Sequence, residues 1–317
     1  MSSMILSLIL VFCGLSIGYT IRKFSNADFS GIRKKIQIFC LLIIAPVTIV
    51  FSVWVAPWKH FEMFSLPFIC VLTLALGAGI AFVLAGPLGL DRQQRAVYFV
   101  CGGFSNLGSL GGLVCFMLIG EAGYALVAFY LLFERIWYFS AGFSLAKSVS
   151  RYSTRKESFS AAAVSLITDP FIALTLASTI IGIIFNMTME RPELFGTINR
   201  IVIPVNSFIL MISIGLAMRF GPMRNYLKHA LVMGMIKGLI MPAFAFSLGM
   251  FFGLDRISGG LPLKTVLILS FMPVGFAALV PPTMYDLDID LANTCWFITT
   301  SGLVISVPLL SFLTSLL

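Results

Sequence analysis

The chain alternates long apolar segments with short polar stretches. Most apolar segments are near the roughly 20 residues that an α-helix needs to cross a hydrocarbon core of about 30 Å. The pattern therefore predicts an all-α membrane protein with ten transmembrane helices. These are 4–21, 36–55, 63–85, 96–119, 122–145, 170–187, 195–217, 231–252, 261–287 and 291–317.

Two of the ten predicted helices are interrupted near their middle. The fourth contains CGGFSNLGSLGG at 101–112, where five glycines in twelve residues weaken a helix through backbone entropy. The ninth contains FMPVGFAALVPP at 271–282, whose prolines lack amide hydrogens. Backbone groups freed inside a bilayer are tolerated only where protein buries them or where they line a cavity. Both interruptions are therefore candidates for a functional site.

Composition supports a membrane protein and narrows its partners. The 317 residues are 59% hydrophobic and 11% charged, whereas soluble domains carry about 25% charged residues. The lipid bilayer is thus the expected environment. The net charge of +8 does not indicate nucleic-acid binding, because the basic residues lie in short loops. All six cysteines lie in apolar segments without a CxxC motif, which favours small buried side chains over disulfides or a metal site.

The basic residues are unevenly distributed between the two sides of the predicted helices. Loops that share one side carry 14 of the 21 Lys and Arg residues, and loops on the opposite side carry 4. Because basic loops remain in the cytoplasm, this bias predicts that both termini lie outside. The first apolar segment is followed, not preceded, by Arg22-Lys23, so we expect a retained helix and not a cleaved signal peptide.

The positions of the interrupted helices predict an inverted repeat. Five predicted helices precede a basic loop and five follow it, and the odd number reverses the orientation of the second half. The interrupted helix is the fourth in each half. We therefore predict a first repeat at 1–147, a cytoplasmic basic loop at 148–158 and a second repeat at 159–317. Matched interruptions in two inverted halves are typical of transporters with a site at the bilayer midplane.

The sequence contains little that indicates an enzyme. It lacks the motifs GxxxxGK[ST] and HExxH, which carry phosphate and zinc chemistry. The loops are too short to hold an ATPase or signalling domain. We therefore expect a protein that is not an enzyme, with no catalytic residues, no metal and no cofactor.

Motifs in both halves resemble one family of membrane carriers. The first half contains FSNLGSLGGLVCFMLIGEAG at 104–123. The second contains DPFIALTLASTIIG at 169–182, LMISIGLAM at 210–218 and MPVGFAALVPPTMYDLDIDLANTCWFITTSGLVISVPLL at 272–310. These stretches resemble the auxin efflux carrier family, which includes plant PIN proteins and bacterial carriers for malonate and other carboxylates. The resemblance covers nearly the whole chain.

This resemblance implies a ten-helix 5+5 inverted-repeat fold, shared with bile-acid symporters and sodium/proton antiporters, in the cell membrane of a bacterium. Helices 4 and 9 would cross at unwound centres. Helices 1, 2, 6 and 7 would form a scaffold, and helices 3–5 and 8–10 a transport domain that shifts in an elevator-type movement. Where the family pattern has an Asn after Met-Pro, this chain has Ala277, which removes a polar contact from the second crossing segment.

We predict an anion site where the two interruptions meet. Each leaves the N-terminus of a half-helix at the midplane, where amide hydrogens and the helix dipole attract an anion. Asn106 adds an amide that both donates and accepts hydrogen bonds. The alternatives are that Asn106 only caps its half-helix and that the interruptions are packing kinks. The predicted substrate-binding residues are Gly103, Ser105, Asn106, Pro273, Gly275, Phe276 and Ala277.

Three charged residues fall near the middle of predicted helices: Glu134, Arg135 and Lys237. A charge at that depth is costly unless it is paired or hydrated. Adjacent helical residues point about 100° apart, so Glu134 and Arg135 need partners elsewhere. Lys237 is the predicted partner of Glu134. The three residues are interpreted either as a structural ion pair inside the transport domain or as residues with a coupling or substrate role.

Small and polar residues on other helices complete the prediction. Gly14 and Gly18, and Gly234 and Gly238, have the GxxxG spacing that permits close helix packing. Asn206 is expected to face the site from the scaffold side.

These observations predict a secondary carrier for a small organic anion, most simply a carboxylate, that works by elevator-type alternating access. The energy source is left open between uniport down the membrane potential, proton coupling through Glu134 and sodium coupling, and a homodimer is a further hypothesis. One alternative is a sodium/organic-anion symporter of the bile-acid type. The other is a membrane sensor or scaffold subunit that transports nothing, which the absence of an Asn at Ala277 favours.

Overall fold

The protein is described by a computed structural model that covers residues 2–25, 28–56, 60–150, 170–218 and 223–317. Most of these residues are helical, and the described residues contain one isolated β-bridge but no strand. Helices satisfy their backbone groups internally, which is what an apolar chain in a bilayer requires. The predicted loop at 148–158 lies mostly outside the described residues.

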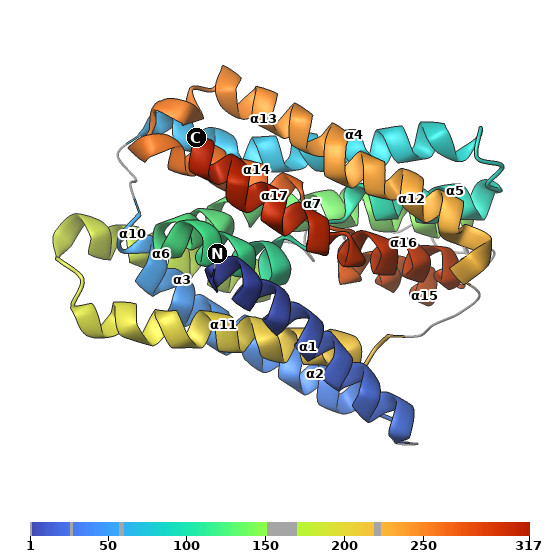
Figure 1. The fold of residues 1–317 in the computed structure, drawn as a ribbon, viewed down its shortest axis with the longest axis horizontal. Coiled ribbons are helices and arrows are strands. Elements are labelled where there is room, and N and C mark those ends of the chain that lie inside the picture. The colour runs from blue at the N-terminus through green and yellow to red at the C-terminus, as the bar shows by residue number, and fades with distance from the viewer. Residues whose placement is uncertain (1, 26–27, 57–59, 151–169, 219–222) are drawn as a thin grey trace.

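One set of helices, which we call the first helix group, packs around α11 and α3 and lies in the lower part of Figure 1. At the contact between α1 and α11, a Cβ added at Gly18 would overlap the carbonyl oxygen of Ile212. The GxxxG pair of α1 therefore serves close packing, as predicted. The group consists of α1 (Ser2–Phe24), α2 (Ser30–Phe39), α3 (Ala45–Val53), α10 (Pro170–Thr188) and α11 (Glu193–Gly215).

The second helix group packs around α4, α5 and α14 and occupies the upper part of Figure 1. A Cβ added at Gly234 or Gly238 would meet no described atom within 4 Å, so this GxxxG pair does not serve packing among the described helices of this chain. The group consists of α4 (Leu66–Ala85), α5 (Arg92–Gly103), α12 (Leu227–Met235), α13 (Met241–Phe251), α14 (Leu261–Ser270), α16 (Ile289–Ser301) and α17 (Leu303–Leu316).

Helix α6 (Gly112–Tyr130) connects the two groups, because it packs on α14 of one and on α3 of the other. At Gly120 its backbone leaves the helical region, with φ 77° and ψ −169°. Such a positive φ is open to glycine and strained for other residues. The chain continues through 131–133, α7 (Glu134–Trp137), 138–143 and α8 (Ser144–Val149).

Both predicted interruptions are present. Helix α5 ends at Gly103, and the next helical turn begins at Leu107. Helix α14 ends at Ser270, and the next turn begins at Phe276, followed by α15 (Val280–Met284). The glycines and prolines identified in the sequence therefore mark where these helices stop.

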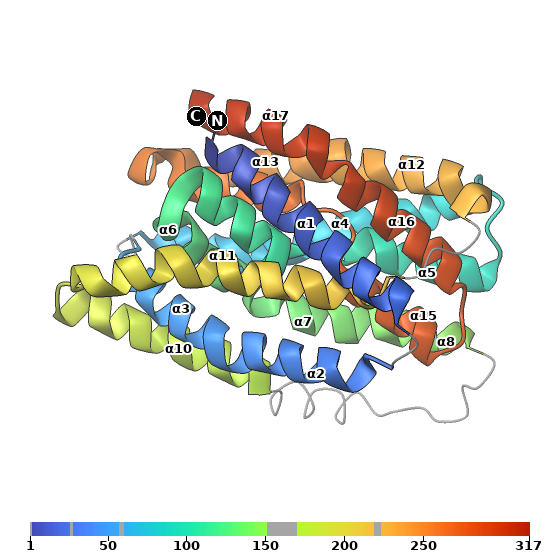
Figure 2. The same ribbon diagram turned by 60° about the horizontal axis from the view of Figure 1, so that its bottom comes forward.

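The described residues include six helices that are long and apolar enough to cross a membrane, or seven if the bent pair α16–α17 counts as one span. Ten spans and the 5+5 repeat stay a prediction. Helices α5 and α14 are not among these spans, because each ends at an interruption and is too short on its own to cross a membrane. Both termini point toward the same end of the bundle as the α10–α11 turn (Figure 1, Figure 2).

Candidate functional site

The two interrupted segments cross and pair with each other. Ser105 and Val274 form an antiparallel β-bridge. The amide of Asn106 donates to the carbonyl of Pro273 at 2.9 Å, and the amide of Gly275 donates to the carbonyl of Phe104 at 3.0 Å. Two segments far apart in the sequence thus replace hydrogen bonds that each helix lost where it stopped.

Glycine at position 275 makes this close approach possible. A Cβ added there would lie 2.8 Å from the carbonyl oxygen of Ser105, which is a backbone atom and cannot easily move aside. The remaining amides of the crossing are also occupied. The amide of Ser105 donates to the Tyr138 hydroxyl at 3.1 Å, and the amide of Val274 donates to Thr299 Oγ1 at 3.2 Å.

The amides where the two segments pair are occupied by the protein. Those of Ser105, Asn106, Val274 and Gly275 all donate to groups of the protein. The pairing satisfies buried backbone groups at the place where the helices stop. An anion would therefore not be bound by these four amides, and its binding at the half-helix N-termini, which begin at Leu107 and Phe276, stays a prediction.

Lys237 is built into the first interruption. In a continuous helix the Gly102 carbonyl would accept from the amide of Asn106, but that amide donates to Pro273. The ammonium of Lys237 takes its place and donates to the Gly102 carbonyl at 2.8 Å. It also donates to the Phe104 carbonyl at 3.2 Å and to Ser105 Oγ at 2.7 Å. These three bonds use all three ammonium hydrogens, although the side chain is only 2% exposed.

The predicted contact between Lys237 and Glu134 is absent among the described residues. Glu134 instead accepts a hydrogen bond from the hydroxyl of Tyr138, one helical turn away, at 2.6 Å. The same hydroxyl lies 3.0 Å from the carbonyl of Ser105. The predicted direct pairing of the two charges is therefore wrong. Lys237 donates to Ser105 Oγ, and Glu134 contacts the hydroxyl of Tyr138, which lies next to the Ser105 carbonyl.

Asn106 caps the turn after the interruption and keeps one donor. Its Oδ1 accepts from Ser109 Oγ at 2.6 Å and from the amide of Leu110 at 3.5 Å. Its Nδ2 is buried and has no hydrogen-bond partner among the described residues. The side chain is 7% exposed. The capping alternative therefore describes its oxygen, while its nitrogen is free to donate to a ligand.

A cavity of about 80 Å³ lies beside the crossing, between the first helix group and the segment 107–135. Most of its wall is apolar, with Ile49 and Leu210 from the first group facing Leu131 and Leu132. Its polar lining is sparse and comes from both sides. These polar residues are Ser109, Tyr124, Arg135, Thr175, Asn206 and Ser207.

The predicted site residues thus divide between two places. Arg135 and Asn206 line the cavity, and the buried Asn206 Oδ1 has no hydrogen-bond partner within the described part of the chain. Gly103, Ser105, Pro273 and Gly275 belong to the crossing; the Gly103 carbonyl accepts from the Trp137 indole at 3.1 Å. Asn106 connects the two places through Ser109.

Phe276 and Ala277 lie in the turn Phe276–Leu279 after the second interruption. The Phe276 ring lies 5.7 Å from the guanidinium of Arg33 of α2 and packs edge-on against Trp296. This contact joins the second interruption to the first helix group.

Sequence reasoning missed Tyr138, Trp137 and Thr299, whose side chains bind the crossing. Tyr138 stands four residues after Glu134, and this i, i+4 spacing was the available signal. Nothing in the sequence marked Trp137 or Thr299, because their roles depend on how distant helices pack.

Comparison with known proteins supports a transporter. No family model matches the chain. Over 250 residues it is 26% identical to a protein of Methanothermobacter thermautotrophicus named "Uncharacterized transporter", and the match covers 79% of this chain and 78% of that protein. Together with the apolar helices, this similarity indicates an integral membrane protein of the transporter type.

Proposed function

We propose that this protein is a secondary carrier for a small organic anion with a single carboxylate. The observation that carries the proposal is the cavity beside the crossing, where one arginine and a few uncharged polar groups interrupt an apolar wall. The similarity of the chain to a protein named as a transporter, over most of its length, also supports a transport function.

The lining favours a substrate with one charged end and an apolar body. The guanidinium of Arg135 is the cationic group of the lining, and it suits a carboxylate geometrically. Asn206 and Ser109 add hydrogen-bonding groups, while Ile49, Leu131 and Leu210 offer apolar contacts. At about 80 Å³ the cavity is well below the roughly 300–1,000 Å³ of ordinary ligand pockets, which favours a molecule of few heavy atoms.

Alternating access by an elevator-type movement fits the position of the cavity. Its walls come from the first helix group on one side and from the segment 107–135 on the other. Relative movement of the two sides would open the cavity without taking the crossing apart. The crossing is held by backbone pairing and by Lys237, so it would move as one unit.

Lys237 bears on the choice of coupling ion. Its ammonium already occupies the carbonyl oxygens of Gly102 and Phe104, which are the kind of ligand that a sodium ion would need. We therefore favour uniport or proton coupling over the sodium symporter of the bile-acid type. Glu134 is the proposed proton carrier. Its protonation would let it donate to Tyr138 and release the hydroxyl hydrogen toward Ser105.

The proposal is tested by uptake of small monocarboxylates into proteoliposomes, with Arg135→Gln as the informative variant. Hydrogen bonds to charged groups contribute about 1.5–3 kcal/mol, so we expect uptake to fall about tenfold or more. Arg92→Gln, at an exposed position of α5, is the matched control and should transport normally.

Three outcomes distinguish the alternatives. Uptake that requires a sodium gradient would favour the sodium symporter. A folded protein that moves no carboxylate under any gradient would favour the sensor or scaffold subunit. Equal uptake by Arg135→Gln and the unaltered protein would remove Arg135 from the site.

A further inference from the structure

A second polar cluster lies at the end of the bundle that carries the α10–α11 turn. Its centre is Glu121, the first residue after the non-helical Gly120 in α6. Oε1 of Glu121 accepts hydrogen bonds from both the guanidinium of Arg191 and the side-chain amide of Asn199. The side chains of Glu121 and Arg191 are 15% and 13% exposed, and Asn199 is fully buried.

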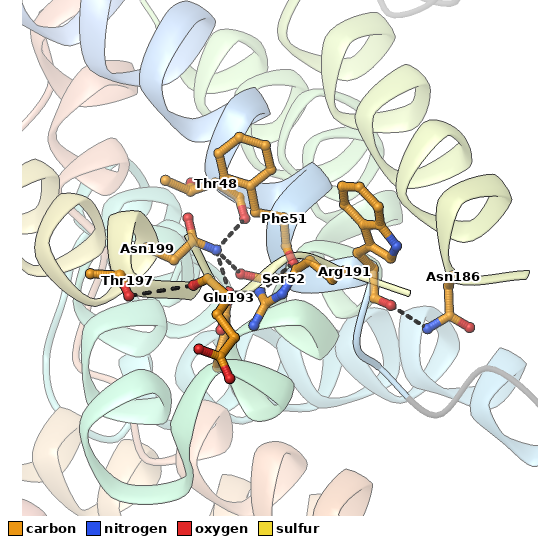
Figure 3. A network of polar contacts seen from close by, with 10 residues as sticks. Thr48, Phe51, Ser52, Asn186, Arg191, Glu193, Thr197 and Asn199 are labelled. Atoms are coloured by element: carbon orange, nitrogen blue, oxygen red, sulfur yellow. Dashed lines mark hydrogen bonds and ion pairs between the residues drawn. The ribbon is translucent and has the colours of Figure 1, made fainter. Parts of the chain in front are cut away.

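The two donors are positioned by the first helix group. Arg191 also donates to the Phe51 carbonyl at 2.8 Å. The same Asn199 nitrogen, which has two hydrogens to share, lies 3.0 Å from Ser52 Oγ and 3.3 Å from the Thr48 carbonyl oxygen. Figure 3 shows Arg191 and Asn199 meeting α3 at Thr48, Phe51 and Ser52. Glu121, from α6, is the member that comes from outside the group.

The absence of a side chain at Gly196 of α11 leaves room for the guanidinium of Arg191. A Cβ added there would lie 2.8 Å from Nη2 of Arg191 and 3.9 Å from Glu121 Oε2. Since the nearest atom is the far end of a flexible side chain, alanine at 196 would displace Arg191 at little expense to the fold.

This cluster separates two cavities. The first is the cavity beside the crossing, and the second, which we call the peripheral cavity, measures about 510 Å³ and has a mostly polar wall. Arg191 of the cluster itself lines the peripheral cavity. Along α11, Gly196 lines the peripheral cavity, Asn199 belongs to the cluster, and Asn206 and Ser207 line the first cavity. The exposed Arg200 also lines the peripheral cavity.

The same order recurs on α3. Ala45 and Ile49 line the first cavity, and Thr48 and Ser52 hold the cluster. Trp54, which follows the last residue of α3, lines the peripheral cavity. Two helices thus place the cluster between the cavities, and the Thr48 hydroxyl, 3.3 Å from that of Tyr124, adds a second contact between α3 and α6 on the inner side.

We propose that Glu121, Arg191 and Asn199 form a gate that closes the substrate cavity toward the peripheral cavity. Opening the gate requires Glu121 to leave two donors that stay behind on the first helix group. This inference rests on the proposed carrier function for its purpose, but its geometry is independent of which substrate is carried.

The test measures access to the substrate cavity through a cysteine reporter. Ser207→Cys, in a Cys13→Ser background, reacts with a membrane-impermeant thiol reagent added to the side on which a Glu190→Cys control reacts. Native Cys40, Cys70, Cys101, Cys115 and Cys295 are buried. Adding Glu121→Gln or Gly196→Ala to the reporter should raise its labelling rate about tenfold, the factor that corresponds to 1.4 kcal/mol.

Glu193→Gln is the matched control, because it removes a carboxylate from the same peripheral cavity without touching the cluster. Its labelling rate should equal that of the reporter alone. The gate proposal is overturned if neither Glu121→Gln nor Gly196→Ala changes the labelling rate. A thermal unfolding transition must first show that each variant is folded. Carboxylate uptake in that situation would leave the carrier proposal standing. Raised labelling in a protein that binds no carboxylate would support the gate and count against the proposed substrate.

Discussion

At the scale of single residues, the crossing depends on side chains that replace missing backbone partners. An interrupted helix leaves carbonyl oxygens without amide donors, and these are costly to bury. The ammonium of Lys237 serves Gly102, Phe104 and Ser105, and the Trp137 indole serves Gly103. Lys237 is therefore first a structural residue of the interruption, whatever its part in coupling.

Lys237→Met tests this role. Removing the ammonium leaves buried oxygens of Gly102 and Ser105 unpaired, and each unpaired group costs about 1–3 kcal/mol. We expect a thermal unfolding midpoint lower by several degrees in detergent. Lys228→Met, at an exposed position of α12, should leave the midpoint unchanged. Equal midpoints for the two variants would show that the crossing does not need the ammonium.

At the scale of elements, two helices stop and use each other's backbone to complete their hydrogen bonds. The pairing between 104–106 and 273–275 is a short antiparallel ladder inside an otherwise helical protein. The pairing needs two backbone segments in close contact, and the absence of a side chain at Gly275 allows this contact. The elements therefore stabilise the crossing together, and neither interruption would be satisfied alone.

Gly275→Ala should separate the two segments. The added methyl group would press on the Ser105 carbonyl and weaken the bond from the Gly275 amide to Phe104. Overpacking of this kind typically costs about 1–3 kcal/mol, measured as a lower stability to heat or denaturant. Gly238→Ala is the control, since its methyl group would meet no described atom. Loss of stability in the control alone would contradict the close approach at 275.

At the scale of the whole molecule, the first helix group and the segment 107–135 together enclose a cavity that neither could form alone. The Lys and Arg distribution predicts which end faces the cytoplasm. The turn between α5 and its preceding helix would face inside, and the α10–α11 turn, with the peripheral cavity, would face outside.

Cysteine labelling in intact cells tests this orientation. In a Cys13→Ser background, Glu190→Cys should react with an impermeant thiol reagent, and Arg92→Cys should react only after the membrane is opened. Both positions are exposed. The reverse pattern would invert the topology and place the proposed gate on the cytoplasmic side.

The class of the molecule and the places where two helices stop can be predicted from the order of residues alone. Long apolar segments specify helices in lipid, and clustered glycines or prolines specify interruptions, because both effects act within a few residues of the chain. The sequence also singled out Asn106, Arg135, Lys237 and Asn206, since a polar or charged group at membrane depth is conspicuous in any context.

What those groups contact follows from the packing of the helices. Lys237 donates to backbone carbonyls instead of pairing with Glu134, and a cavity that Arg135 and Asn206 line lies beside the crossing. This packing also brings Glu121 to Arg191, 70 residues away. The physical reason is that hydrogen-bond partners in this protein lie on different helices, and sequence periodicity describes one helix at a time.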